Sequence, residues 1–521
     1  MSKIYWNNTR IFGAFAELEE QFARFLQDKR MCFPGVSEEA ARKRLVQKFF
    51  ERCYFPYARI CARRHAAGSY PLPPDASLEL EGIRFDQKSG KLSVSPGLVF
   101  LCILKFMNDW LRLSLYICKS LRLSASSNLR QSVLVWGIGA ESIFSQNSDD
   151  AFAAYLRSGP VLPLSTGYRI VQYGKKLISG NDDSLVYHPR PVEGMLELQS
   201  LSIAKFSRLM AAHFQMMVRF VYACFRQPFL CLLHVDAAYA GIIGKMDQWG
   251  ILESVVFTNA IFTQYTWMRS DTRSFSVHQV YYSQNIKPLV YKADPYWADY
   301  PGYKHLHADE VWLWNEDIAH YLRRLGFEGI THITAPIAWR LPHEVNPDST
   351  SRNIVIFDIS PIDDKAALNF GIINNYFSEQ NLRQFIGDIL DVCEEVNNEY
   401  GMELRLIIKH KRPTAKIHTS SYQDYIEALV NTGKIAAVAA HDADIFSLIG
   451  EHPLTISIPF TSTVYISEWM KKPAVIYDFS GQLEDNYIHS ADTSFVNSKA
   501  ALREKFSEVF NSAHHQNRVI S

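Results

Sequence analysis

The chain has 521 residues, which at roughly 100–200 residues per domain predicts about two to four domains. Lys and Arg together number 54, as do Asp and Glu, so the formal net charge is zero, which argues against nucleic-acid coating as a main function. An apolar fraction of 47% with only 21% charged residues provides for large cores and excludes global disorder. The eight cysteines form no CxxC pair, which indicates reduced thiols and a cytoplasmic protein.

The first 125 residues are predicted to form a mostly helical N-terminal extension. Apolar residues recur at helical spacing over Glu17–Arg30 and over Glu38–Arg64, and nothing in the extension resembles a catalytic motif. The proline-rich break at Tyr70–Pro74 ends this pair of helices.

Two further segments, Leu98–Leu123 and Phe206–Val235, are apolar enough to require a membrane check. Both carry charges at helical spacing, such as Lys105 and Arg219, so they are predicted to be amphipathic helices rather than free transmembrane spans. Two interpretations stay open. In the first, the two segments are core helices with one solvent-facing stripe. In the second, they form a face that rests on the inner membrane with Lys and Arg toward lipid phosphates.

The chain between residues 126 and 345 is predicted to be a first Rossmann-like domain, the acceptor domain. The apolar run Ser132–Trp136 is a buried strand that ends in the turn Gly137–Glu141. Similar apolar runs, with helical stretches between several of them, occur at Ser254–Thr258, Ser276–Tyr282, Glu310–Trp314 and Ile330–Ala335. Alternation of this kind predicts a largely parallel sheet.

Residues 346–521 are predicted to be a second Rossmann-like domain, which binds the donor and ends in a closing helix. A polar linker over Leu341–Arg352 precedes it. Its strands are expected at Asn353–Ile359, Glu403–Lys409, Ile435–Ala440, Leu454–Ile458 and Ala474–Asp478. The predicted fold class is therefore α/β and GT-B-like: two Rossmann-like domains face each other across a cleft, and the ligand lies where the carboxyl ends of the strands meet.

Two motifs of the second domain come directly after predicted strands. In the first, Lys409, His410, Lys411 and Arg412 can all be cationic and suit a phosphate, although a solvated basic loop is the alternative. In the second, the hydroxyls of Thr461, Ser462 and Thr463 precede a predicted helix. They are expected to form an N-cap whose free backbone N–H groups bind an anion, and the alternative is an ordinary capping cluster without a ligand. The strands that carry the two motifs are expected to be neighbours.

A third strand end, Phe357–Pro361, includes Ser360, which is predicted to line the same pocket or to form a turn without ligand contact. No GxGxxG and no Walker motif is present, which disfavours dinucleotide dehydrogenases and P-loop enzymes. The acidic pairs Asp363-Asp364 and Asp442/Asp444 lie where helices are expected to start rather than at strand ends, so we expect no metal and no cofactor. A basic site can neutralise a leaving phosphate without a metal ion.

The first domain offers two candidate catalytic carboxylates. Gly139 lets the backbone approach a ligand closely, and Glu141 lies one turn after a strand, where it is a candidate general base or a residue at a helix start. Asp236 lies in an apolar run and is either a second catalytic carboxylate or a buried, hydrogen-bonded Asp. Polar groups at two further strand ends suit acceptor hydroxyls or form turns: Thr258, Asn259, Tyr282, Ser283 and Asn285.

Taken together, Lys409–Pro413, Pro459–Thr463 and Lys471–Asp478 resemble bacterial surface-carbohydrate biosynthesis proteins of the O-antigen and capsule type. The first two are similar to the His-Pro and Ser/Thr motifs of GT-B glycosyltransferases that use CMP-sugars, namely the Kdo- and sialyltransferases. Trp136–Ser145 and Tyr281–Asn285 also resemble the surface-carbohydrate group. The resemblance covers roughly residues 131–480 and leaves the extension outside it.

The resemblance implies that His410, Ser462 and Thr463 hold the phosphate and nucleotide of the donor. The chain departs from the family pattern because Lys411 and Arg412 separate His410 from Pro413, so the phosphate is alternatively expected on the basic side chains beside His410, and the identity of the nucleotide is open. The family base, an Asp or Glu of the first domain, matches Glu141. A retaining reaction would need a carboxylate nucleophile, which keeps Asp236 a candidate.

The implied function is transfer of Kdo or another ulosonic acid from a CMP-sugar to a lipid-linked glycan acceptor at the inner face of the membrane. The alternatives are a GT-B transferase that uses an NDP-sugar or a CDP-polyol, and a non-catalytic scaffold that binds nucleotide-sugars in the same pathway.

Overall fold

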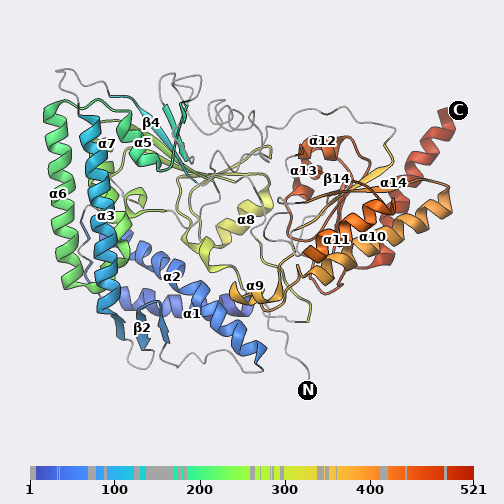
Figure 1. Cartoon of the computed structure of the whole chain (residues 1–521), viewed down its shortest axis with the longest axis horizontal. Coiled ribbons are helices and arrows are strands. Elements are labelled where there is room, and N and C mark those ends of the chain that lie inside the picture. The colour runs from blue at the N-terminus through green and yellow to red at the C-terminus, as the bar shows by residue number, and fades with distance from the viewer. Residues whose placement is uncertain are drawn as a thin grey trace.

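The structure is a computed structural model that describes residues 8–27, 29–31, 33–34, 36–67, 78–86, 91–121, 129–136, 169–173, 178–179, 185–258, 264–269, 272–281, 283, 287–293, 298–336, 345, 351–359, 361–410, 420–440, 443–485 and 490–520. They form two α/β domains side by side, with the N-terminal helices packed on the first (Figure 1).

The first domain is built on a sheet of order β11-β10-β9-β8-β4-β5-β7-β6. All of its strand pairs are parallel except β6 with β7. The strands are β4 (Ser132–Trp136), β5 (Arg169–Tyr173), β6 (Ile178–Ser179), β7 (Leu185–His188), β8 (Leu252–Thr258), β9 (Ser276–Val280), β10 (Glu310–Leu313) and β11 (Ile330–Ile333). Counted along the chain, the parallel strands from β7 to β10 have the doubly wound order 3-2-1-4-5-6.

Helices cover this sheet. They are α5 (Pro191–Glu197), α6 (Ile203–Arg226), η2 (Pro228–Leu233), α7 (His234–Gln248), η3 (Thr266–Arg269), η4 (Pro301–His305) and α8 (Glu316–Arg324). Of these, α6 and α7 lie on the side away from the second domain, and α8 lies toward it (Figure 1). Helix α8 begins at Asn315, whose side chain accepts a hydrogen bond from the Ile318 amide, as an N-cap requires. The segment expected to be one helix over Phe206–Val235 is interrupted after Arg226, because Pro228 begins a short 3-10 turn.

The N-terminal extension is mostly helical, as predicted, and shares one hydrophobic core with the first domain. Its elements are α1 (Asn8–Gln27), α2 (Glu38–Ala66), β1 (Leu78–Leu80), β2 (Ile83–Asp86), β3 (Lys91–Val94) and α3 (Pro96–Ser120). Phe15, Phe50 and Phe106 of these helices belong to the same buried cluster as Phe257 of β8. The sequence pattern does not predict the small antiparallel sheet β1-β2-β3.

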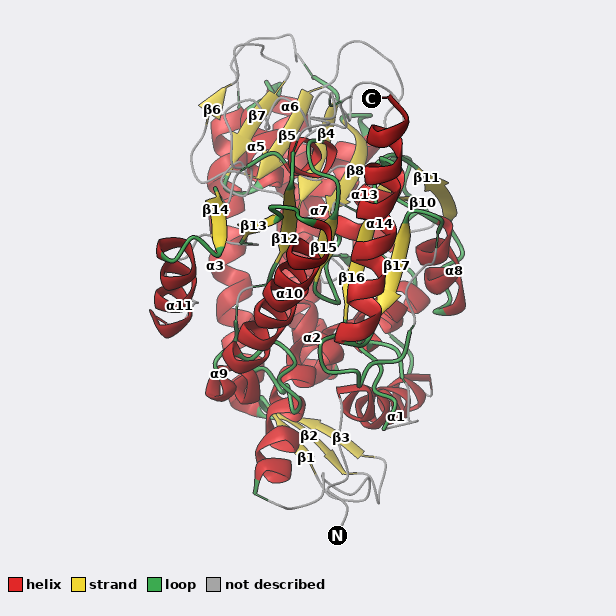
Figure 2. Ribbon diagram, turned by 90° about the vertical axis from the view of Figure 1, so that its right-hand side faces the viewer, coloured by secondary structure: helices red, strands yellow, loops and turns green. Residues whose placement is uncertain are grey.

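The second domain has a six-stranded sheet of order β14-β13-β12-β15-β16-β17, in which every pair is parallel. The strands are β12 (Asn353–Phe357), β13 (Arg405–Lys409), β14 (Ile435–Ala439), β15 (Thr455–Ser457), β16 (Ala474–Tyr477) and β17 (Thr493–Val496). Their Val- and Ile-rich sequences suit strands that helices cover on both faces (Figure 2). The strand order is again 3-2-1-4-5-6, which confirms the predicted α/β, GT-B-like architecture of two Rossmann-like domains.

The helices of the second domain are α9 (Asp364–Asn369), α10 (Glu379–Tyr400), α11 (Ser420–Asn431), α12 (Ile445–Gly450), α13 (Thr463–Trp469) and α14 (Lys499–Ile520). The long helix α10 shows why the sequence folds this way. Ser378 caps its start by accepting from the Asn381 amide, and Gly401 ends it in the left-handed conformation with φ of 63°.

One expectation about this sheet is wrong. The strands before the basic motif and the PFTST motif, β13 and β15, are not neighbours, because β12 lies between them and pairs with both. The first strand of a doubly wound sheet takes the central position, and the sheet then grows outward on either side. The third motif, at the end of β12, therefore lies between the other two.

Residues 287–293, named here the crossing segment, run from the first domain to the second and connect the two. Tyr291 is buried in the core of the second domain and pairs with Leu483 in an antiparallel bridge. The amide of Lys292 donates to the Gln482 carbonyl at 2.8 Å, and the amide of Glu484 donates to the Val290 carbonyl at 2.8 Å. These backbone bonds fix the two domains beside each other.

Candidate active site

Asp358, the residue directly after β12, is the centre of a buried polar cluster at the carboxyl end of the second sheet. Its Oδ2 lies 2.6 Å from Nδ1 of His410, the residue after β13, and it accepts a hydrogen bond of 2.9 Å from the Tyr422 hydroxyl of α11. Its other oxygen, Oδ1, has no hydrogen-bond partner in the part of the chain that the structure describes. Asp358 thus joins β12, β13 and α11 and keeps acceptor capacity at this edge.

The surroundings of His410 favour its charged form. Burial opposes protonation, but the hydrogen bond and the negative charge of Asp358 together outweigh burial and the repulsion of Lys409, so the pKa of His410 is raised. Lys409 and His410 are only 5% and 6% exposed. This half of the basic motif is therefore not a solvated loop, while Lys411 and Arg412 lie outside the described residues.

The PFTST motif forms a tight turn between β15 and α13. Phe460 has a φ of 70°, which non-glycine residues seldom adopt and which is often found at functional sites. The Thr461 hydroxyl donates to the Ile458 carbonyl at 3.0 Å, and the Thr463 hydroxyl lies 2.7 Å from that of Ser457. These two hydroxyls hold the turn against β15 from the inside.

The expectation that these hydroxyls cap the adjoining helix is wrong. Ser462 takes the N-cap position of α13, but its side chain makes no capping hydrogen bond. Its backbone, with φ of −89° and ψ of −8°, is helical, whereas a capping side chain needs an extended residue to reach the helix amides.

Ser462 instead reaches the other domain. Its Oγ lies 2.8 Å from Oγ of Ser283, which comes shortly after β9 of the first sheet. A residue predicted to bind the acceptor and a residue predicted to bind the donor are thus in direct contact. The carboxyl ends of the two sheets meet at this point, as the GT-B-like layout requires.

Of the remaining predicted residues, Asp236 is placed in full. It lies on α7 with no exposed surface, where its Oδ1 is 3.1 Å from Nε of Arg44 and accepts from the Thr266 amide at 2.7 Å. This is the geometry of the alternative interpretation, a buried hydrogen-bonded Asp. Thr258 ends β8, and only its backbone is described. The others lie outside the described residues: Gly139, Glu141, Asn259, Tyr282, Asn285, Ser360, Lys411 and Arg412.

Sequence reasoning missed Asp358 and Tyr422. Asp358 stands in the motif Phe357–Pro361, and the available signal is its acidic side chain directly after four apolar residues of β12. Tyr422 gives no signal, because one Tyr on an amphipathic helix does not differ from a core residue. Among the described residues, no group of three or more His, Cys, Asp or Glu is placed to hold a metal ion.

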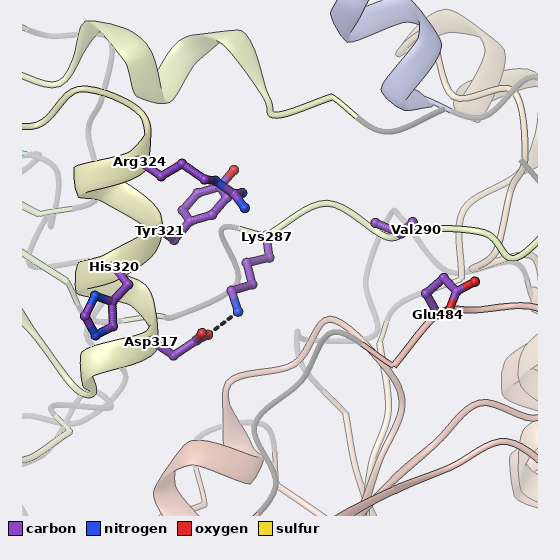
Figure 3. Close-up of a pocket in the computed structure, with 7 residues that line it drawn as sticks. All are labelled: Lys287, Val290, Asp317, His320, Tyr321, Arg324 and Glu484. Carbon is purple, nitrogen blue, oxygen red and sulfur yellow. Dashed lines mark ion pairs between the residues drawn. The ribbon is translucent and has the colours of Figure 1, made fainter. Parts of the chain in front are cut away.

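A separate pocket of about 410 Å³ lies where α8 meets the crossing segment, and Glu484 of the second domain is one of the residues that line it (Figure 3). Lys287 and Asp317 form an ion pair inside it, and Arg324 lies on the same helix as Asp317. None of the predicted site residues lines this pocket. It belongs to the junction between the domains rather than to the polar cluster around Asp358.

This geometry defines the class of the protein. It is a two-domain α/β protein with a polar cluster at the point where the strand order of its second sheet reverses. The family model described as "Polysaccharide biosynthesis PFTS motif protein" matches residues 216–506 of the 521. The letters of that motif stand at Pro459–Ser462, in the turn between β15 and α13. The chain belongs to this family of polysaccharide biosynthesis proteins.

Several solved structures are similar in outline. The sucrose-phosphate synthase of Thermosynechococcus elongatus is 11% identical over 74% of this chain and 91% of its own, with a TM-score of 0.39. The wall teichoic acid polymerase TagF is 11% identical over 81% and 90%, with a TM-score of 0.36. The α,α-trehalose 6-phosphate synthase of Burkholderia multivorans is 9% identical over 75% and 94%, with a TM-score of 0.36. Such low values transfer no activity, and no curated protein matches the chain.

Proposed function

We propose that the chain is a glycosyltransferase of bacterial surface-polysaccharide biosynthesis, of the O-antigen or capsule type. In this proposal a nucleotide-linked sugar binds at the ends of β12, β13 and β15, and the acceptor binds on the side of β4, β8 and β9. The observation that carries it is the contact between Ser462 of the PFTS turn and Ser283 of the other domain, beside the buried pair of Asp358 and His410.

The chemistry of the donor edge suits a departing nucleotide phosphate. Lys409 and protonated His410 are buried positive groups, and charge in a site that excludes water stabilises a developing anion strongly. Asp358 engages Nδ1 of His410, so the ring would donate to a phosphate oxygen through Nε2. With these groups on the chain, the proposed transfer needs no metal ion and no cofactor other than the nucleotide-sugar itself.

On the acceptor side, Glu141 is the proposed general base that removes the proton from the attacking hydroxyl. Asp236 is not proposed as a nucleophile, because it is fully buried on its ion pair with Arg44. The donor we propose is CMP-linked, with Kdo or another ulosonic acid as the sugar, and the acceptor is a lipid-linked glycan at the cytoplasmic face of the membrane. An NDP-sugar or a CDP-polyol would use the same edge.

A thermal-shift panel with CMP, UMP, CDP, UDP and GDP tests the donor site. Bound ligand at about 100 times its Kd adds about 2.7 kcal/mol of stability, which is a readily measured shift. We expect CMP to stabilise the wild type and His410→Gln to lose the shift. Ser462→Ala is measured in the same panel. Its matched control is Ser207→Ala, which removes an exposed hydroxyl on α6.

A preference for UDP, GDP or CDP would keep the donor edge and change the donor class. No shift with any nucleotide would overturn the donor site. Nucleotide binding without sugar transfer to a lipid-linked acceptor would leave the non-catalytic scaffold as the better description.

A further inference from the structure

The outer helices α3 and α6 expose an unusual number of large apolar side chains. They lie side by side at the end of the first domain that is farthest from the second (Figure 1). These side chains are each between 44% and 76% exposed: Phe100, Leu101, Leu104, Leu111, Leu115, Ile203, Phe214, Val218, Tyr222 and Phe225. Contiguous apolar surface of this kind marks an interaction site rather than ordinary solvent-facing surface.

These side chains form one surface, named here the α3–α6 face. Leu104, Leu111 and Leu115 recur at helical spacing on α3, and Phe214, Val218, Tyr222 and Phe225 do so on α6. The opposite stripes of both helices are buried, and both helices contact α7. Because each exposed stripe points away from the side that packs on α7, the two stripes face the same way.

The charges beside the α3–α6 face are almost all positive. Helix α6 carries no acidic residue, and its charged side chains are Lys205, Arg208, Arg219 and Arg226. Helix α3 adds Lys105, whereas its Arg112 is paired with Asp109 at 2.6 Å and with Glu193 at 3.1 Å, and its Lys119 is paired with Glu197 at 2.9 Å. In a chain with zero net charge, this concentration of cations beside an apolar stripe is complementary to anionic lipid headgroups.

The two helices are suited to lie on a bilayer and not to cross it. Of the described residues, only Pro228–Gln248 is long and apolar enough to span, and that segment is 78% buried inside the protein. Helices with an apolar face, a basic flank and low net hydrophobicity bind in the interfacial plane. A second copy of the chain fits poorly, because a symmetric contact through this face would bring the arginines of two α6 helices into one interface, and α6 carries no acidic residue to pair with them.

We propose that the α3–α6 face docks on an anionic lipid bilayer, with its apolar side chains between the headgroups and its arginines on lipid phosphates. This inference goes beyond the proposed function and does not depend on the donor site.

The test is co-sedimentation of the full chain with vesicles of phosphatidylcholine alone, or of two parts phosphatidylcholine to one part phosphatidylglycerol. The basic variant is Arg208→Gln with Arg219→Gln and Arg226→Gln, and its control removes exposed cations elsewhere, at Lys365, Arg405 and Lys434. The apolar variant is Phe214→Gln with Val218→Gln and Phe225→Gln. Its control is Ile330→Gln with Phe370→Gln, at residues that are 59% and 60% exposed.

We expect the wild type to bind the anionic vesicles, the basic variant to bind them about a hundredfold more weakly, and the apolar variant at least about tenfold more weakly. Both controls should bind like the wild type. Absence of wild-type binding, or equal binding by all variants, would overturn the proposal. So would a dimer in light scattering that the apolar variant abolishes, since the face would then bind a second copy. Nucleotide-induced thermal shifts should stay unchanged in every variant, so this result is separable from the donor site.

Discussion

Two buried aspartates with cationic partners, Asp236 in the first domain and Asp358 in the second, differ in their place in the fold. Asp236 lies on a helix, pairs with Arg44 of the extension, and neither side chain has any exposed surface. Asp358 lies at the end of the central strand, where loops rather than core side chains come next. A buried carboxylate in the body of a domain joins elements, whereas the same group at the carboxyl edge of a doubly wound sheet is placed to meet a ligand.

The largest effect that we expect is loss of stability in Asp236→Asn. Removing the Asp236 charge leaves buried Arg44 with Glu51, at 2.7 Å, as its remaining ion partner, so we expect a cost of about 3 kcal/mol, at the lower end for breaking a buried ion pair. The urea midpoint of the full chain measures it, with Asp424→Asn, at an exposed position of α11, as the control. A variant that keeps its midpoint but loses sugar transfer would make Asp236 catalytic and would remove the contrast with Asp358.

Glu141→Gln should lower kcat about a hundredfold or more while leaving the unfolding midpoint unchanged. The amide keeps the size of the side chain but cannot accept the proton of the acceptor hydroxyl. Transfer from the nucleotide-sugar that the panel selects is the assay, and unaltered nucleotide binding is the control. Full activity in this variant would move the base elsewhere in the first domain.

Most of the second domain could be predicted from its sequence, and the reason is physical. Its strands are continuous Val- and Ile-rich runs buried on both faces, so that NIVIF and AVIYD stand out without any knowledge of their neighbours. Strand order is harder to predict, because it depends on which strands pair, and that pairing is decided by contacts between residues far apart in the sequence. The interposition of β12 between β13 and β15 therefore appeared only in the structure.

The first domain was harder to predict for two reasons. Strands β5 and β7, RIVQY and LVYH, are short and carry polar residues, so they gave no apolar run. The role of Asp236 depends on Arg44, which lies 192 residues away in the sequence. At the candidate site, strand-end position identified His410, Ser462 and Ser283. The partner of His410 required the fold, since Asp358 and His410 come from different strands.

The raised pKa of His410 predicts that the stability of the protein depends on pH. A pKa raised on folding stabilises the protein fully below the unfolded-state value near 6.5, and this stabilisation is lost as pH rises through the folded-state value. The stability difference between wild type and His410→Gln should therefore be largest near pH 6 and smallest near pH 9. Nucleotide affinity should fall over the same interval. A difference that grows with pH would mean that Asp358 does not hold the ring in its charged form.

The smallest effect concerns the contact between the domains. Ser462→Ala and Ser283→Ala each remove one partner of a hydroxyl pair, so each should cost about 0.5–1.5 kcal/mol. Because the two hydroxyls are in contact, the double variant should cost less than the sum of the two single variants, and the shortfall is their coupling energy. Strictly additive costs in urea unfolding would mean that the two hydroxyls do not contact each other in solution. In that case Ser462→Ala should weaken nucleotide binding more than Ser283→Ala does.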